Sequence, residues 1–189
     1  MRNKFALLPL FLVLIPLAFW LGLKTSDNGP EKAVYAAGSK EKFDYLSQSG
    51  NSSCSTEFTN SIPQMPEGET LKGSCCSQMV FDRYEEQVEG LKKYSNISEI
   101  PPDPYDISAD LAEKLVGHYD SELTADQQKA YDFAMENSHE KGPCCCKCWR
   151  WYVYGGLGKY LIQNYGFTGE QVTEVWNLSD GCGGSGDHA

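Results

Sequence analysis

Four of the eight cysteines in this 189-residue chain fall within five residues, inside the run Gly-Pro-Cys-Cys-Cys-Lys-Cys-Trp over positions 142–149. They are Cys144, Cys145, Cys146 and Cys148. Thiols gathered this densely serve as thiolate metal ligands, as redox partners or as halves of disulfides, because packing alone does not require them. The cluster is therefore where the chemistry of the protein is expected, and three classes of chemistry are open.

The first class is a thiolate metal site. Pro143 suits the first position of an α-helix, which would place Cys144 to Cys146 in the first turn, where free N–H groups and the helix dipole stabilise thiolates. Lys147 and Arg150 add local positive charge. Thiolates select soft metals, so Cu(I) and Zn(II) are the expected ions, with Hg(II) and Cd(II) as further candidates. Alternate cysteines on a strand would stand about 6.6 Å apart, too far for one ion, so the site requires a turn or a helix.

Three distant cysteines are expected to converge on this cluster. Cys75 and Cys76 would lie at the start of a helix, where thiolate is again favoured, and Cys182 lies in a glycine-rich segment that can fold over a site at little steric cost. Adjacent cysteines have Cα atoms 3.8 Å apart, below the usual disulfide range, so each needs a distant partner. His139, five residues before Cys144, is the best histidine candidate for an additional ligand.

Two alternatives to a metal site stay open. Eight cysteines permit four disulfides, which would make a stapled structural or interaction domain. Cys145 and Cys148 also form a Cys-x-x-Cys pair that suits thiol–disulfide exchange, although no βαβ pattern precedes it. Trp149 stands where haem attachment needs histidine, and no histidine carries a local signature of cysteine-protease catalysis. A binding protein is therefore favoured over an enzyme.

The N-terminal residues predict export. Arg2 and Lys4 precede an uncharged apolar stretch over residues 5–23, the layout of a signal peptide or of a single membrane anchor. The stretch is longer than the usual signal core of about 7 to 15 residues and close to the roughly 20 that span a bilayer, whereas Val34-Tyr35-Ala36 offers a cleavage pattern. Cleavage and anchoring both stay open, and either one places the rest of the chain outside the cytoplasm, in the periplasm or at the cell surface.

The net charge of the chain limits the classes of partner that it can bind. The chain carries a formal net charge of −10, and residues 1–36 are net basic, so the exported part is more acidic still. Such a surface repels phosphate backbones and attracts cations. The charge therefore argues against nucleic acid as a partner and leaves cations as the natural attraction, and the alternative that acidic charge only keeps an exported protein soluble stays open.

The elements that must position these residues are mostly helices. Ser108 is expected to cap a helix, and Thr124 with Gln127 predicts a capping box for another that ends near Asn137. Thr168 predicts a further short helix. Apolar periodicity indicates a helix over 75–94, and residues 149–165 suit helix or strand because of their glycines.

Composition divides the chain into four parts. We expect a signal peptide or anchor over 1–36, a flexible tether over 37–73 that carries Cys54 as an isolated thiol, a helical domain with the cysteine motif over 74–180, and a glycine-rich tail over 181–189. The predicted fold class is a mainly α, small single helical domain.

Residues before and inside the cluster match a family pattern. Ala130-Tyr131-Asp132-Phe133-Ala134 precedes Pro143-Cys144-Cys145-Cys146-Lys147-Cys148. This combination resembles a bacterial exported family named for its Pro-Cys-Tyr-Cys-Gly-Cys motif, in which an Ala-Tyr-x-Phe-Ala helix leads into the motif. Here Cys145 replaces the tyrosine, Lys147 replaces the glycine, and the Gly-His pair that follows the motif is absent. The resemblance covers roughly a third of the exported chain; it implies an exported cysteine-motif protein and lends some support to metal binding.

Overall fold

Hydroxyl side chains set the start of five helices in the computed structural model, which describes residues 35–182. In each helix a Ser or Thr oxygen accepts a hydrogen bond from a backbone N–H of the first turn, which satisfies a donor that the helix itself leaves unpaired. The five are α1 (Lys40–Gln48, Ser39), α2 (Thr56–Ser61, Ser55), α4 (Ala109–Gly117, Ser108), α5 (Ala125–Asn137, Thr124) and α7 (Gly169–Ser179, Thr168). The predicted Ser108 cap and the capping boxes of α5 and α7 are confirmed.

The other two α-helices begin without such a cap. Helix α3 (Phe81–Leu91) follows Val80, and α6 (Trp149–Tyr165) follows Cys148 in an extended conformation. Helix α6 ends at Gly166, whose φ of 65° is the left-handed conformation that glycine adopts without strain. The segment 149–165, which suited helix or strand by sequence, is therefore a helix.

Two short strands and two 3₁₀ turns complete the secondary structure of the described residues. Strand β1 (Thr70–Lys72) pairs antiparallel with β2 (Asp106–Ser108), so that buried Leu71 lies opposite buried Ile107. The 3₁₀ turns are η1 (Ile62–Gln64) and η2 (Lys92–Tyr94). The mainly α fold class is confirmed for residues 35–182, which belong to one small unit.

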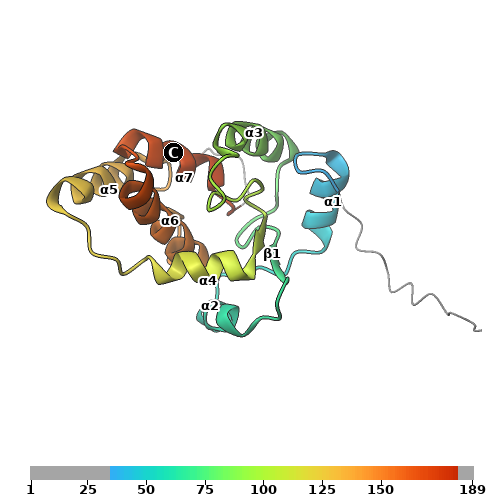
Figure 1. Cartoon of the computed structure of the whole chain (residues 1–189). Coiled ribbons are helices and arrows are strands. Elements are labelled where there is room, and N and C mark those ends of the chain that lie inside the picture. The colour runs from blue at the N-terminus through green and yellow to red at the C-terminus, as the bar shows by residue number, and fades with distance from the viewer. Residues whose placement is uncertain (1–34, 183–189) are drawn as a thin grey trace, which may run out of the picture. The chain divides into compact units, whose positions relative to one another are not determined.

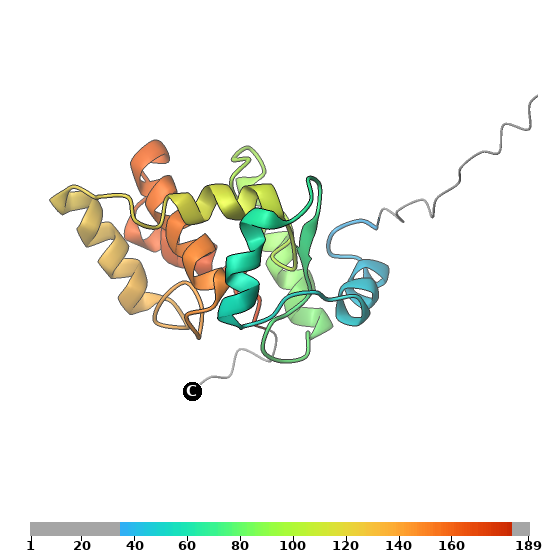
Figure 2. The same cartoon turned by 90° about the horizontal axis from the view of Figure 1, so that it is seen from below.

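Helix α6 lies at the centre of the main core, against α4, α5 and α7 (Figure 1; Figure 2 gives the view from below). Close approach to α4 requires Gly156, because a Cβ there would lie 1.9 Å from the carbonyl oxygen of Leu115. Val153, Leu157 and Leu161 are fully buried on α6. Burial of each such side chain is worth about 1.5–3 kcal/mol, so the core holds the N-terminal end of α6, next to the cysteine cluster, in a defined position.

The expected tether over 37–73 is wrong. This segment contains α1, α2, η1 and β1, and Leu46, Ile62 and Leu71 on it are buried. The serines that suggested a linker are helix caps at Ser39 and Ser55. The domain consequently does not begin near Ser74 but includes these N-terminal elements.

The expected signal or anchor over residues 5–23 and most of the tail, 183–189, lie outside the described residues. Within residues 35–182, no helix combines the length and the apolar character needed to cross a bilayer.

Candidate metal centre

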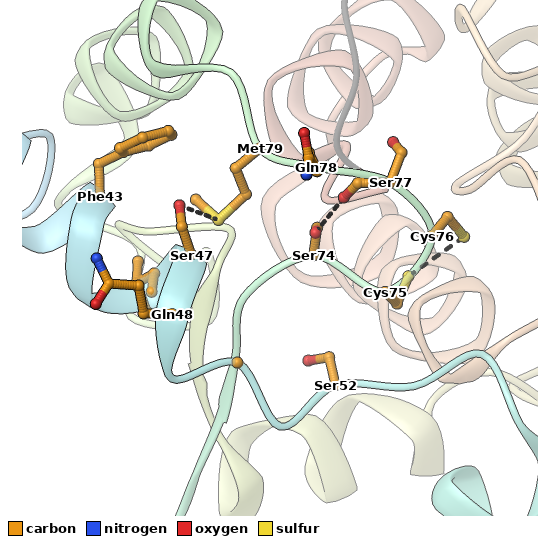
Figure 3. Close-up of a pocket in the computed structure, with 12 residues that line it drawn as sticks. Phe43, Ser47, Gln48, Ser52, Ser74, Cys75, Cys76, Ser77, Gln78 and Met79 are labelled. Atoms are coloured by element: carbon orange, nitrogen blue, oxygen red, sulfur yellow. Dashed lines mark hydrogen bonds between the residues drawn. The ribbon is translucent and has the colours of Figure 1, made fainter.

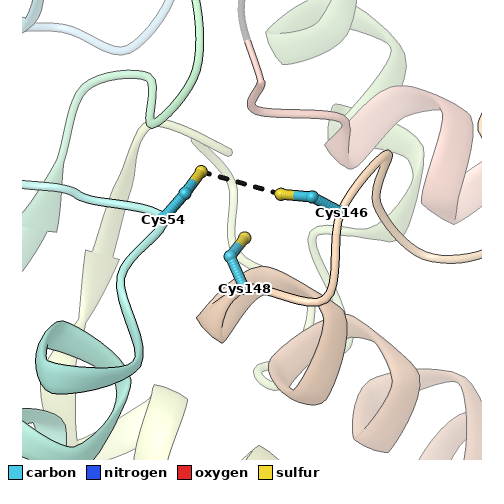
Figure 4. A group of neighbouring side chains, drawn as sticks. All are labelled: Cys54, Cys146 and Cys148. Carbon is cyan, nitrogen blue, oxygen red and sulfur yellow. Dashed lines mark hydrogen bonds between the residues drawn. The ribbon is translucent and has the colours of Figure 1, made fainter.

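Eight cysteines from four separate segments meet at one place. Cys54 precedes α2, Cys75 and Cys76 lie between β1 and α3, and Cys182 follows α7. The remaining four are the cysteines of the loop that enters α6. Figure 4 shows Cys54, Cys146 and Cys148 with their sulfurs turned toward one another, although Cys54 comes from a segment 92 residues away from Cys146. The predicted convergence of Cys75, Cys76 and Cys182 on the cluster is confirmed by the sulfur contacts.

Sulfur–sulfur contacts cross segment boundaries at six of these cysteines, and the other two, Cys75 and Cys148, contact Cys76 and Cys144 of their own segments. In the part of the chain described, which contains all eight, every cysteine is a free thiol. The contacts are Cys54–Cys76 2.9 Å, Cys54–Cys146 3.6 Å, Cys75–Cys76 3.7 Å, Cys76–Cys146 3.9 Å, Cys144–Cys148 3.8 Å, Cys144–Cys182 3.1 Å and Cys145–Cys182 3.0 Å. Each is longer than the S–S bond of about 2.05 Å.

The cluster has two ends that differ in exposure. At the inner end, Cys144, Cys148 and Cys182 are each 2% exposed. At the outer end, Cys54, Cys76 and Cys145 are exposed. Cys75 and Cys146 are half-buried and lie between these extremes. The names inner end and outer end are used below for these two sets of three.

The loop over 139–148 is a turn and not the first turn of a helix. The expectation that Pro143 begins a helix is wrong, because α6 begins at Trp149 with Cys148 as its N-cap residue. Ahead of the proline the backbone adopts positive φ at Lys141 (52°) and Gly142 (153°), which a helix does not contain. Cys75 and Cys76 likewise precede α3, which starts at Phe81.

Buried contacts hold this loop in place. The Ser138 hydroxyl donates to the carbonyl of Gly142 over 2.9 Å and accepts from its N–H over 2.8 Å. A Cβ at Gly142 would lie 2.7 Å from the ring of Trp151, so only glycine fits beneath that ring. The loop therefore turns back on itself and delivers four thiols to one side of the N-terminal end of α6.

The C-terminal segment is tied to the loop that carries Cys75 and Cys76. The carbonyl of Cys182 accepts hydrogen bonds from the N–H and the hydroxyl of Ser77, at 2.9 and 3.0 Å. The N–H of Cys182 donates to the Asp180 carboxylate over 3.1 Å. A Cβ at Gly181 would lie 2.1 Å from Arg150, so the tail passes directly over that guanidinium.

Cys54 is the cluster member that the sequence did not predict. Asn51 ties its segment to β1, accepting from the Lys72 N–H over 2.7 Å and donating to the Thr70 carbonyl over 2.9 Å. Helix α2 then packs on α6 through Phe58 and Trp149, whose ring centroids are 6.3 Å apart. This separation lies within the range of about 4.5–7 Å for interacting aromatic pairs. The one signal for Cys54 in the sequence is the Ser55 cap directly after it, which marks a folded segment.

Arg150 supplies a buried positive charge beside the thiols. It is fully buried, donates to the carbonyls of Pro104 (2.7 Å) and Gly73 (3.0 Å), and lies over the Trp149 ring at 4.5 Å. Burial alone would lower the pKa of Arg150, but the negative charge available on Tyr154 and Cys75 raises it. Among the described residues, Arg150 Nε has no hydrogen-bond partner, so part of its charge is available to a nearby anion.

The pKa values of the thiols are shifted in opposite directions within the cluster. Hydrogen bonds from Cys144 and then Cys75 lower the pKa of Cys148 far below its ordinary value of 9.0. The pKa of Cys182 is raised, first through its hydrogen bond with Cys144, and burial raises the pKa of Cys76 to about 12. One thiolate is thus stabilised by neighbouring thiols that keep their protons. A cation that replaces those protons would satisfy the same sulfurs.

Groups of three sulfurs meet the spacing that a metal ion needs. In each group the three sulfurs lie within 4.8 Å of one another, and every cysteine of the chain belongs to at least one group. The groups are Cys54–Cys75–Cys76, Cys76–Cys145–Cys182, Cys144–Cys145–Cys146 and Cys54–Cys146–Cys148. His139 belongs to none of them within residues 35–182. Its N–H donates to the Asn177 side chain, and it lines a separate cavity of about 410 Å³, so the structure does not bring this predicted ligand to the cluster.

A second cavity opens beside the outer end of the cluster. It has a volume of about 640 Å³, and its lining includes Cys75, Cys76 and Met79 (Figure 3). The Ser47 hydroxyl contacts the Met79 sulfur at 3.8 Å. Two thiols and one thioether therefore line the same cavity.

Comparison of the chain with family models, with curated proteins and with solved structures gave no match. The resemblance to the Pro-Cys-Tyr-Cys-Gly-Cys family therefore stays a prediction.

Proposed function

We propose that this protein binds a soft metal outside the cytoplasm, through the cluster of eight cysteines. One observation carries the proposal: eight thiols from four segments meet with several sulfur–sulfur distances of 3.6–3.9 Å. Ligands bound tetrahedrally at about 2.3 Å from one ion stand about 3.8 Å apart. The contacts of Cys54–Cys146, Cys75–Cys76 and Cys144–Cys148 thus have the spacing of ligands to a common ion.

The chemistry of the donors supports a soft ion. All the candidate ligands are sulfur, and thiolates select Cu(I) and Zn(II) among the common metals, with Hg(II) and Cd(II) also compatible. The buried Arg150 guanidinium offsets part of the thiolate charge, and the acidic chain attracts cations. The apolar stretch over 5–23 supports export or anchoring, and a bound metal would keep the thiols from oxidation in that setting.

The experiment is elemental analysis of the full chain, purified under anaerobic and reducing conditions. We expect stoichiometric soft metal, together with eight cysteines that alkylate only after a chelator removes it. Protein that stays metal-free when offered Cu(I) and Zn(II), and whose eight cysteines are all oxidised by mass spectrometry, would contradict the proposal and establish the disulfide alternative.

Thiol–disulfide exchange is the second candidate function, and two observations favour it. The contacts Cys54–Cys76 and Cys145–Cys182 are as short as 2.9 and 3.0 Å, and the pKa of Cys148 is lowered. Redox catalysis needs that low-pKa thiol to be accessible, whereas Cys148 is 2% exposed. Iodoacetamide trapping across pH distinguishes the two functions: one cysteine that reacts fast well below pH 8 supports exchange, and uniform slow reaction supports the metal site.

A further inference from the structure

We infer that an oxidising compartment divides the eight cysteines into two disulfides and one site of four thiolates for a single soft ion. The disulfides join Cys54 to Cys76 and Cys145 to Cys182, and the ligands are Cys75, Cys144, Cys146 and Cys148. This inference rests on the proposed function, including its setting outside the cytoplasm, and specifies which cysteines hold the ion. It follows from the sulfur–sulfur distances, from the exposure of the thiols and from the position of the buried charge.

Two pairs of thiols are too close together to be ligands of the same ion. The sulfurs of Cys54 and Cys76 are 2.9 Å apart, and those of Cys145 and Cys182 are 3.0 Å apart. With metal–sulfur bonds of about 2.3 Å, these separations would close the angle at the metal to about 80°, well below the roughly 109° of a tetrahedral ion. A disulfide bond of about 2.05 Å instead needs each pair to approach by only about 0.9 Å.

Each of these pairs joins segments that are far apart in the chain. Cys54 precedes α2, and Cys76 lies 22 residues later, between β1 and α3. Cys145 lies in the loop before α6, and Cys182 lies 37 residues later, after α7. Neighbours in sequence have Cα atoms about 3.8 Å apart, below the usual disulfide range of about 4.4–6.8 Å. Both pairs therefore give a cysteine with cysteine neighbours the distant partner that it needs.

Cys182 has a second close neighbour in Cys144, at 3.1 Å. Cys144 also lies 3.8 Å from Cys148, which is the separation of two ligands on a tetrahedral ion. A bond between Cys182 and Cys145 leaves that contact intact and uses an exposed thiol. A bond between Cys182 and Cys144 would remove Cys144 from its ligand position, so the pairing with Cys145 is the one that we assign.

The four remaining thiols are close enough to share one ion. Cys144 and Cys148 are 3.8 Å apart, and Cys146 lies within 4.8 Å of both. The Cys75 thiol joins this group through its hydrogen bond to Cys148. Four thiolates arranged tetrahedrally are a common ligand set of structural Zn(II), which makes Zn(II) the soft ion that fits best.

The exposure of the thiols supports the same division. The three exposed thiols are those of the outer end, and each assigned disulfide contains at least one of them. None of the four assigned ligands is exposed, since two are buried and two are half-buried. An external oxidant therefore reaches the assigned pairs more readily than the ligands, and a bound ion is shielded from solvent.

The buried charge lies beside the assigned ligands. The Arg150 guanidinium is fully buried and interacts favourably with negative charge on Cys75 and Cys144, both of which belong to the ligand set. One divalent ion neutralises two of the four thiolate charges. Arg150 offsets part of the remainder without itself binding the metal.

Each disulfide forms by exchange with an external disulfide, which is the oxidant. A thiolate of the pair attacks that disulfide, so that a mixed disulfide forms and one external thiol leaves. The partner thiolate attacks the mixed disulfide, the protein disulfide forms, and the second external thiol leaves. The external disulfide thus gains the two electrons and two protons that the pair loses, while the ion keeps its oxidation state and each ligand releases its proton to solvent.

The reduced chain keeps all eight thiols, so its outer end stays open to metal exchange. The two disulfides would remove all three outer-end thiols from that route. They would also tie the segment of Cys54 to the loop of Cys76, and the end of the chain to the loop before α6. The ion would then be held by the four thiolates that oxidation leaves.

The test starts from the reduced full chain, loaded with one equivalent of Zn(II) and equilibrated anaerobically with oxidised and reduced glutathione. Native mass spectrometry counts the ions, and tandem mass spectrometry of alkylated, unreduced peptides identifies the disulfides. We expect one Zn(II) per chain and the two assigned disulfides. The four cysteines that alkylate only after a chelator is added should be Cys75, Cys144, Cys146 and Cys148.

The other outcomes separate this inference from the proposed function. Bound metal with eight free thiols, or binding of Cu(I) without binding of Zn(II), would overturn the inference and leave the proposed function standing. A disulfide between Cys144 and Cys182 would overturn the assigned ligands. Four disulfides with no bound Cu(I) or Zn(II) would overturn both proposals.

Two substitutions at adjacent positions separate a ligand from a disulfide partner. Cys75→Ser removes a ligand, so both disulfides should form while Zn(II) affinity falls at least about tenfold, because loss of a group that only supports a ligand already costs about 10–100-fold. Cys76→Ser makes the same chemical change next to it and should keep the affinity while losing the disulfide to Cys54. Circular dichroism checks that both variants fold. Equal Zn(II) affinities in the two folded variants would contradict the assigned division.

Discussion

The two ends of the cysteine cluster are built from the same side chain but sit in different surroundings. The inner end belongs to the main hydrophobic core together with Trp149, and each of its three thiols is 2% exposed. The outer end is carried by loops and opens toward solvent. Enclosure favours retention of an ion, since water and competing ligands are kept out, whereas exposure favours its exchange. If the cluster binds metal as proposed, the inner end would retain an ion and the outer end would exchange it.

The largest effect is expected at the buried Arg150, two residues after Cys148 of the inner end. Arg150→Met keeps much of the side-chain volume but leaves the carbonyls of Pro104 and Gly73 unpaired. Each buried group that loses its partner costs about 1–3 kcal/mol, so we expect the free energy of unfolding of the metal-free protein to fall by about 3 kcal/mol. Urea unfolding measures this change.

Arg150→Lys is the control for that variant, because it keeps the charge without the planar pair of hydrogen bonds. Its free energy of unfolding should lie between those of the native chain and Arg150→Met. A midpoint for Arg150→Met equal to that of the native chain would show that the inner end does not depend on this residue.

A smaller effect is expected at Gly181, where the tail crosses Arg150. A Cβ at this position would lie 2.1 Å from the guanidinium, so Gly181→Ala must move the tail and with it Cys182. Overpacking of this kind costs about 1–3 kcal/mol, and we expect Cu(I) affinity to fall about tenfold. Competition with a Cu(I) chelator measures the affinity.

Gly117→Ala is the matched control, because a Cβ at Gly117 has no atom within 4 Å among the described residues. It should leave the affinity unchanged. If Gly181→Ala binds Cu(I) as tightly as Gly117→Ala does, the close passage of the tail over Arg150 is not what places Cys182.

Acid should act on the cluster and on the rest of the domain through different groups. The Lys114 ammonium, with hydrogen bonds from Ser98 and Tyr160, lowers the pKa of Glu99 from 4.5 to about 2. A lowered pKa means that Glu99 contributes stability above about pH 4.5 and that this contribution disappears as the pH falls toward 2. A metal bound to the thiolates, as proposed, would instead be displaced by protons.

Glu99→Gln should therefore flatten the dependence of the metal-free protein's unfolding free energy on pH between about 4.5 and 2. The pH at which half of the copper is released should not change, since Glu99 lies outside the cluster. Urea unfolding and copper release, followed over the same pH series, test both statements. A shift of copper release in this variant would show that the two regions are coupled.

The smallest effect is expected at Met79, beside the outer end. Its thioether borders the same cavity as Cys75 and Cys76, and thioethers bind Cu(I). Met79→Leu conserves volume, so its cost in stability should stay below about 1.5 kcal/mol. We expect a few-fold slower transfer of Cu(I) to an added chelator with unchanged stoichiometry, measured by stopped-flow absorbance. An unchanged rate would rule out the thioether as a step on the exchange route.

Local signals in the sequence predicted local structure well. Ser108, Thr124 and Thr168 cap the helices they were expected to cap, because a cap depends on contacts within one turn. The density of cysteines over 144–148 likewise indicated where the cysteine cluster lies, because these four cysteines are close together in the sequence. Composition gave a wrong prediction for residues 37–73. The serines there resemble those of a linker, yet Ser39 and Ser55 are the N-cap residues of helices.

The sequence by itself determined the helical class, the acidic charge and a set of thiols that only a soft metal or oxidation would use. The tertiary structure decided which sulfurs meet, that Cys54 joins them, that His139 does not, and that the loop before α6 is a turn. The physical reason is range. Caps and periodicity act within a few residues, whereas the cluster depends on contacts across as many as 105 residues, such as Ser77 with Cys182, which form only when the core around α6 has packed.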